Sequence, residues 1–129
     1  MKIEHLAIWV NDLELMKDFY VKYFDMTCGN KYTNSQKQFS SYFLSFKNGG
    51  ARIELMHRED ILPAVQDKSI SKGFTHFAIS TGSKKKVNEL TEQLRTNGYN
   101  ITGEPRTTGD GYYESVVSDP DGNSIEITV

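Results

Sequence analysis

Apolar and polar residues follow two patterns along the chain, alternation in short runs and spacings of three and four in two longer stretches. Alternation over residues 3–10 predicts a strand, with Ile3, His5, Ala7 and Trp9 on one face. The helical spacing then runs from a capping Asn11 or Asp12 to about residue 25, through Leu13, Met16, Phe19, Tyr20, Tyr23 and Phe24. The first 25 residues therefore predict a strand and an amphipathic helix.

Three more strands are expected in the first half of the chain. Strand-forming residues lie near 31–34 and 39–46, and Asn48-Gly49-Gly50 is a strong hairpin signal before a strand at 52–56. The second half shows the same order. A strand at 73–81 precedes a helix capped by Ser83 and ended near Gly98, and strands are expected at 99–103, 111–118 and 124–129.

The two halves also repeat in sequence. His5 is the third residue of a pattern that begins at Ile3, and His76 is the third of a pattern that begins at Phe74, 71 positions later. Glu54 and Glu126 occupy matching strands 72 positions apart. An internal repeat of this length predicts two copies of one structural unit. We expect a single domain over residues 1–129, with module 1 at about 1–57, a connector at 58–72 and module 2 at about 73–129.

The repeated histidines and glutamates are candidates for a metal site. If the modules pair about a pseudo-twofold axis, His5, Glu54, His76 and Glu126 can converge. Two imidazoles and two carboxylates suit divalent zinc, nickel, cobalt, iron or manganese. A lone histidine or glutamate in a strand is more often packed or solvent-facing, but four at matched repeat positions favour a shared site.

Composition and charge limit the other possibilities. The net charge is -2 with both signs interspersed, which argues against a nucleic-acid partner. The single cysteine, Cys28, excludes an intramolecular disulfide and fits a reducing compartment. No window approaches 18 apolar residues, so a membrane span is not expected. We expect a cytoplasmic protein.

Five stretches resemble the vicinal oxygen chelate superfamily, which includes glyoxalase I, bleomycin-resistance proteins, fosfomycin-resistance thiol transferases and extradiol dioxygenases. The stretches are residues 3–8, 11–20, 52–55, 73–79 and 119–126, and the last, with its Asp-Pro-Asp-Gly turn, is the most specific. The resemblance implies an α+β fold in which two paired βαβββ modules form an open barrel-like sheet, the glyoxalase/bleomycin-resistance/dioxygenase fold. It also implies a homodimer.

Within that superfamily the four candidate ligands resemble the two-histidine, two-glutamate shell of glyoxalase I. The resemblance implies metal-dependent lyase or isomerase chemistry, with proton transfer next to a carbonyl and a low-molecular-weight thiol as co-substrate. His5 and His76 would hold the metal, Glu126 would be the base and Glu54 its pseudo-symmetric partner. The alternatives on the same fold are metal-dependent thiol transfer, ring cleavage by a dioxygenase, and binding of a small molecule without chemistry.

One position departs from the glyoxalase I pattern. The family usually has an arginine four residues after the first ligand histidine, to hold a glutathione carboxylate, and this chain has Trp9. Arg52 or Arg58 could supply the missing charge. Trp9, Arg52 and Tyr113 are expected to line the substrate pocket, which an indole would make more apolar or aromatic.

Overall fold

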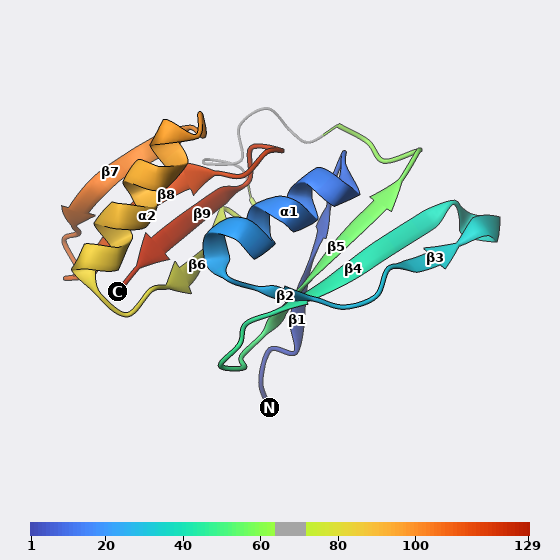
Figure 1. Ribbon diagram of the computed structural model, residues 1–129, viewed down its shortest axis with the longest axis horizontal. Helices are drawn as coiled ribbons and strands as arrows, with labels where there is room; N and C mark the ends of the chain where they lie inside the picture. Colours follow the sequence, from blue (N-terminus) through green and yellow to red (C-terminus); the bar gives the residue numbers. More distant parts are fainter. Residues whose placement is uncertain (64–71) are drawn as a thin grey trace. The chain divides into compact units, whose positions relative to one another are not determined.

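The computed structural model describes residues 1–63 and 72–129, and the chain forms two compact units, Met1–Pro63 and Ala64–Val129 (Figure 1). These units are called module 1 and module 2 below. Each has one α-helix and one open mixed sheet, so the expected α+β class is confirmed. Most of the expected connector lies outside the described residues. Neither α-helix of the described part has the length and hydropathy needed to cross a membrane.

Module 1 is built on a sheet in the order β1-β5-β4-β2, with the short β3 also paired to β4. β1 runs parallel to β5, and the other pairings are antiparallel. The bounds are β1 His5–Trp9, β2 Thr27–Cys28, β3 Tyr32–Asn34, β4 Phe39–Ser45 and β5 Arg52–Arg58, with a 3-10 turn at Ser35–Lys37. Because β1 and β5 are parallel neighbours, side chains near their starts lie close together.

Helix α1, Leu13–Phe24, covers one face of this sheet (Figure 1). Its N-cap is Asp12, whose carboxylate accepts a hydrogen bond from the Leu15 backbone amide at 2.9 Å. The six residues expected at helical spacing are all buried, which confirms the amphipathic helix. Against them pack buried side chains from the strands, Leu44, Ile53 and Leu55. The other face of the sheet, here called the open face of module 1, carries His5 and Glu54.

Module 2 repeats this arrangement with the sheet order β6-β9-β8-β7, in which β6 and β9 are parallel. The bounds are β6 His76–Ser80, α2 Lys84–Thr96, β7 Ile101–Thr107, β8 Tyr113–Ser118 and β9 Ser124–Thr128. Ser83 caps α2 as expected. In the buried layer beneath the helix, Thr91 and Ser115 hydrogen-bond to each other at 2.7 Å. The opposite face is the open face of module 2.

Several strand bounds differ from the sequence prediction. β5 continues to Arg58 because His57 and Arg58 pair with Ser40 and Phe39 of β4. β7 continues to Thr107, because Arg106 and Thr107 pair with β8 after register shifts in the ladder. β2 was not predicted. In each case the pairing partners come from another strand, so the local alternation of side chains gave no signal.

Candidate metal centre

His5 and Glu54 form a pair on the open face of module 1. In the parallel ladder His5 lies opposite Arg52 and Ala7 lies opposite Glu54, so the glutamate is two residues beyond the partner of the histidine. Their side chains lean together, and His5 Nε2 lies 3.7 Å from Glu54 Oε2. The glutamate side chain is 16% exposed and the imidazole 38%. The carboxylate is therefore mostly buried beside a more accessible ring.

His76 and Glu126 form the matching pair in module 2. His76 lies opposite Ser124, and Ala78 lies opposite Glu126, which repeats the register of module 1. His76 Nε2 is 3.2 Å from Glu126 Oε1. The exposed fractions, 42% for His76 and 19% for Glu126, are also similar. The sequence repeat thus corresponds to a repeated geometry in which Nε2 of a histidine faces the carboxylate of a glutamate.

A turn organised by the buried Asp119 leads into the strand of Glu126. The carboxylate of Asp119, which is 4% exposed, accepts hydrogen bonds from the backbone amides of Asp121 and Asn123 at 3.0 and 2.8 Å. Its second oxygen accepts from Asn123 Nδ2 at 2.8 Å. Gly122 has φ +78°, a left-handed conformation that glycine adopts without strain. The turn fixes the start of β9, and Glu126 follows three residues after Asn123.

The surroundings of His5 add two further contacts. Its Nδ1 lies 2.5 Å from Glu4 Oε2, and its ring meets the Phe43 ring edge-on at 5.3 Å. The Arg52 guanidinium reaches Glu4 Oε1 at 2.5 Å and lies over the Phe43 ring at 4.2 Å. The pKa of the Glu4 carboxyl lies below its ordinary value, first because of the hydrogen bond from His5 and also because of Arg52. Arg52 is thus engaged with Glu4.

Trp9 lies on the same open face, two side-chain positions beyond His5. It is 47% exposed and meets the Phe39 ring edge-on at 6.1 Å, and Tyr32 continues this contact with Phe39 at 6.1 Å. On β6 and β9 of module 2, the residues that share a face with Glu126 are small or polar. Ala78, Ser80, Ser124 and Thr128 lie on the strands around Glu126. The two open faces are therefore chemically unlike.

One expected pocket residue, Tyr113, and one candidate for the missing charge, Arg58, make their side-chain contacts elsewhere. Tyr113 lies on the helix-covered face of module 2, opposite to Glu126, and its hydroxyl donates to Asn88 Oδ1 of α2 at 2.8 Å. The structure does not bring it together with the His76 and Glu126 pair. Arg58, the second candidate for a charge near Trp9, donates two hydrogen bonds to Asp60 at 2.8 and 2.7 Å.

Both donor pairs fit a divalent metal in chemistry, and the pair in module 2 also fits in spacing. Two ligands about 2.1 Å from one ion and at roughly 90–110° to each other lie about 3.0–3.4 Å apart. The 3.2 Å spacing in module 2 falls within that span, and the 3.7 Å spacing in module 1 lies slightly outside it. Among residues 1–63 and 72–129, no group of three or more histidine, cysteine, aspartate or glutamate side chains is placed to hold an ion. A four-residue centre thus stays a prediction.

Comparison with known proteins decides the family. The model of the Glyoxalase/Bleomycin resistance protein/Dioxygenase superfamily matches residues 2–127. The chain belongs to this superfamily. A relative within it, the lactoylglutathione lyase of Arabidopsis thaliana, is 33% identical over 126 residues, which are 95% of this chain and 42% of that protein. The lactoylglutathione lyase of Escherichia coli O157:H7 is 28% identical over 130 residues, 98% of this chain and 91% of that protein.

Solved structures of the superfamily agree with the fold. Glyoxalase I from Zea mays matches with a TM-score of 0.80 and 27% identity, over 98% of this chain and 44% of that one. A superfamily domain from Frankia matches with a TM-score of 0.83 at 18% identity, which concerns the fold alone. The chain spans less than half the length of its plant relatives. The expected superfamily and fold are confirmed.

Sequence reasoning missed the contacts around His5. Glu4 and Phe43 were not candidates, because the predicted strand at 3–10 places Glu4 on the face opposite to His5, and Phe43 lies in a strand whose register to β5 was unknown. The one available signal was the acidic residue next to a candidate ligand histidine. Carboxylates often accept the second ring N–H of metal-bound histidines.

Proposed function

We propose that the chain is a glyoxalase I-like lyase or isomerase that uses a divalent metal ion and transfers a proton next to a carbonyl. The observation that carries this proposal is the repeated geometry of the His5–Glu54 and His76–Glu126 pairs. The same pair occurs at the same ladder register in both modules. The similarity to lactoylglutathione lyases over nearly the whole chain supports the same reaction class.

Each residue of the proposed centre has a distinct task. His5 and His76 would bind the ion through Nε2, and Glu54 and Glu126 would bind it through carboxylate oxygens. The ion would act as a Lewis acid that makes a proton next to the chelated carbonyl easier to remove. Glu126 would be the base that takes this proton and returns it to the neighbouring carbon. Its mostly buried carboxylate is poorly hydrated, which favours proton transfer over exchange with water.

The substrate would lie against the open face of module 1. Trp9, with Phe39 and Tyr32 beside it, offers an exposed aromatic surface to an apolar part of the substrate. Glyoxalase I enzymes usually have an arginine at the position of Trp9, which holds a carboxylate of glutathione. This chain has no basic residue at that position, and Arg52 is engaged with Glu4. We therefore propose a thiol co-substrate that needs no carboxylate clamp at this position.

The assembly is part of the same proposal. We propose a single domain of two modules that forms a homodimer in the cytoplasm. The metal centre would combine the histidine–glutamate pair of one module with the pair of another module. The two modules would belong either to one chain or to the two chains of the dimer. Sedimentation equilibrium of the purified protein tests the dimer. A monomer at micromolar concentration that is nevertheless active would contradict it.

The reaction itself is tested with methylglyoxal and a panel of low-molecular-weight thiols, glutathione included. Metal-free protein is loaded separately with zinc, nickel, cobalt, manganese or iron(II), and thioester formation is followed by absorbance. We expect one or more of these metals to support turnover. Absence of thioester with every thiol and metal would contradict the proposal.

Variants give the control for that assay. Glu126→Gln keeps the size of the side chain and removes the base, so we expect at least a hundredfold loss of turnover, within the usual range for general bases. Glu89→Gln, on the exposed surface of α2, is the matched control and should retain full activity. If Glu54→Gln still binds metal at full strength, a three-ligand centre of the thiol-transferase or dioxygenase type is favoured.

The exposed aromatic row also supports a second candidate, binding of a small aromatic molecule without chemistry. Trp9 is the single tryptophan of the chain, so its fluorescence reports directly on this surface. Saturable quenching by a small aromatic ligand, together with no bound metal by elemental analysis and no stabilisation by added metal, would favour binding over catalysis.

A further inference from the structure

The two histidines of the proposed centre differ in what holds their second ring nitrogen. His5 Nδ1 lies 2.5 Å from Glu4 Oε2. Thr75 stands where module 2 would have the counterpart of Glu4. Within residues 1–63 and 72–129, His76 Nδ1 has no such carboxylate partner. His5 and His76 can therefore be compared directly within one protein. Nε2 of each ring faces a glutamate, whereas only Nδ1 of His5 has a carboxylate partner among the described residues.

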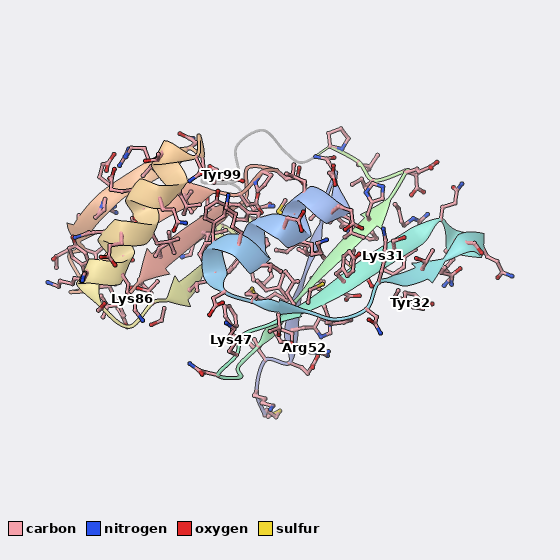
Figure 2. All side chains as sticks on the ribbon, in the orientation of Figure 1. Lys31, Tyr32, Lys47, Arg52, Lys86 and Tyr99 are labelled. Atoms are coloured by element: carbon pink, nitrogen blue, oxygen red, sulfur yellow. The ribbon has the colours of Figure 1, made fainter. Side chains whose placement is uncertain are left out.

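Arg52 fixes the position of Glu4. Its guanidinium reaches Glu4 Oε1 at 2.5 Å, and its backbone amide donates to the Glu4 carbonyl at 2.9 Å. The guanidinium also lies over the Phe43 ring, which in turn contacts the edge of the His5 ring. Figure 2 labels Arg52 near the N-terminal segment, at the start of β5. These contacts link His5, Glu4, Arg52 and Phe43 in a closed cycle. In module 2 the position equivalent to Arg52 is Ser124.

A carboxylate that accepts from Nδ1 determines the tautomer of a neutral histidine. An ionised carboxylate has only acceptors, so the ring hydrogen must lie on Nδ1. Nε2 is then the nitrogen with a lone pair, and it is the atom that faces Glu54 at 3.7 Å. Only an unprotonated ring nitrogen can bind a metal. The hydrogen bond therefore prepares His5 as a ligand before any ion arrives.

We propose that Glu4, held by Arg52, is a positioning residue that keeps His5 in the Nδ1–H tautomer with Nε2 directed at the metal position, and that His76 lacks an equivalent. Module 1 is then the preorganised half of the centre, and its histidine binds the ion more strongly. This proposal rests on the proposed function for the identity of the ion, but the tautomer of His5 in the metal-free protein does not depend on it.

The direct test is long-range ¹H–¹⁵N NMR of metal-free protein labelled at histidine, recorded at a pH where the imidazoles are neutral. Wild-type His5 should show the Nδ1–H pattern, and Glu4→Ala should shift it to the Nε2–H form that free imidazole side chains prefer. Glu4→Gln keeps an acceptor oxygen and should restore part of the Nδ1–H population. Thr75→Ala makes the same kind of change beside His76 and should leave both rings as they are.

We expect these variants to fold, because the Glu4 side chain is 57% exposed and Glu4 is not one of the buried residues of the core. A Nε2–H pattern for His5 in the wild type, or a pattern that Glu4→Ala does not change, would overturn the proposal. Arg52→Gln gives an intermediate case. It should loosen Glu4 and lower the Nδ1–H population less than Glu4→Ala does.

Metal affinity gives the second measurement, by competition of zinc or cobalt with a chromophoric chelator. Loss of a hydrogen-bond partner behind a ligand typically weakens binding about 10–100-fold, and we expect Glu4→Ala to fall in this range. Thr75→Ala should bind like the wild type. Equal affinity in wild type and Glu4→Ala would overturn the positioning role. If even the wild type binds no metal, the proposed function fails, and the NMR result still decides whether Glu4 sets the tautomer.

Discussion

Replacement of Asp119 by alanine should destabilise module 2 strongly, because one buried carboxylate organises the turn before β9. The substitution removes at least three hydrogen bonds, two from the backbone amides of Asp121 and Asn123 and one from the Asn123 side chain. A hydrogen bond to a charged group contributes about 1.5–3 kcal/mol, and contributions within one turn overlap. We therefore expect Asp119→Ala to lower the free energy of unfolding by about 3 kcal/mol.

Asp119→Asn separates the effect of charge from that of shape. Its remaining oxygen can still accept from both backbone amides, while its new amide group faces Asn123 Nδ2 and loses one bond. The expected loss is about 1 kcal/mol. Glu89→Ala is the control, since the Lys85–Glu89 pair is exposed and contributes less than about 0.5 kcal/mol.

Urea unfolding of metal-free protein, followed by far-UV circular dichroism, measures these differences. The order should be Glu89→Ala, then Asp119→Asn, then Asp119→Ala. Because the turn also sets the start of β9, Asp119→Ala should weaken metal binding at temperatures where the protein is still folded. An Asp119→Ala variant within 1 kcal/mol of the wild type, or equal to Asp119→Asn, would refute this account of the turn.

Two further predictions concern Glu14 in module 1 and Gly103 in module 2. The pKa of Glu14 is lowered to about 2, first by the hydrogen bond from Lys17 and then by the one from Lys31. The ionised Glu14 therefore stabilises the folded state at pH values above its ordinary pKa of 4.5, and this stabilisation is lost as the pH falls towards 2. Because solvent screens this exposed carboxylate, Glu14→Gln should lower the free energy of unfolding by only about 1 kcal/mol at pH 6, and by nothing at pH 2. Urea unfolding at a series of pH values would measure this. Gly103→Ala should cost about 1–2 kcal/mol, since its Cβ would lie 2.9 Å from Val116 Cγ2, and a Val116→Ala second change should recover part of that loss in the same unfolding assay.

Local sequence predicted the helices and the approximate strands well. The buried face of α1 was predicted residue by residue, because the helical period of 3.6 and the Asp12 cap can be recognised within one short stretch of sequence. The capped start of α2 at Ser83 was found for the same reason. The strand ends were predicted less well, since Arg58 and Thr107 are in strands only because β4 and β8 offer partners to them.

The candidate site was predicted in part. The four candidate ligand positions came from the repeat, and each module places its histidine beside its glutamate. Tyr113 was expected in the pocket, but the register of β8 turns it towards α2. The strand at 113–118 has apolar residues on both faces, with Tyr113 and Val117 on one and Val116 on the other, so its own pattern did not show which face packs against the helix.

The sequence by itself determined which residues recur, which segments are helices, and that two histidines and two glutamates occupy equivalent strands. Only the tertiary structure decided that β1 lies parallel to β5 and β6 to β9, which sets the 3.7 and 3.2 Å spacings of the two pairs. It also decided that Glu4 meets His5 and Arg52, although Arg52 is 48 positions away in the chain. The physical reason is that helix periodicity and capping are local, while strand pairing joins residues that have no fixed relation along the sequence.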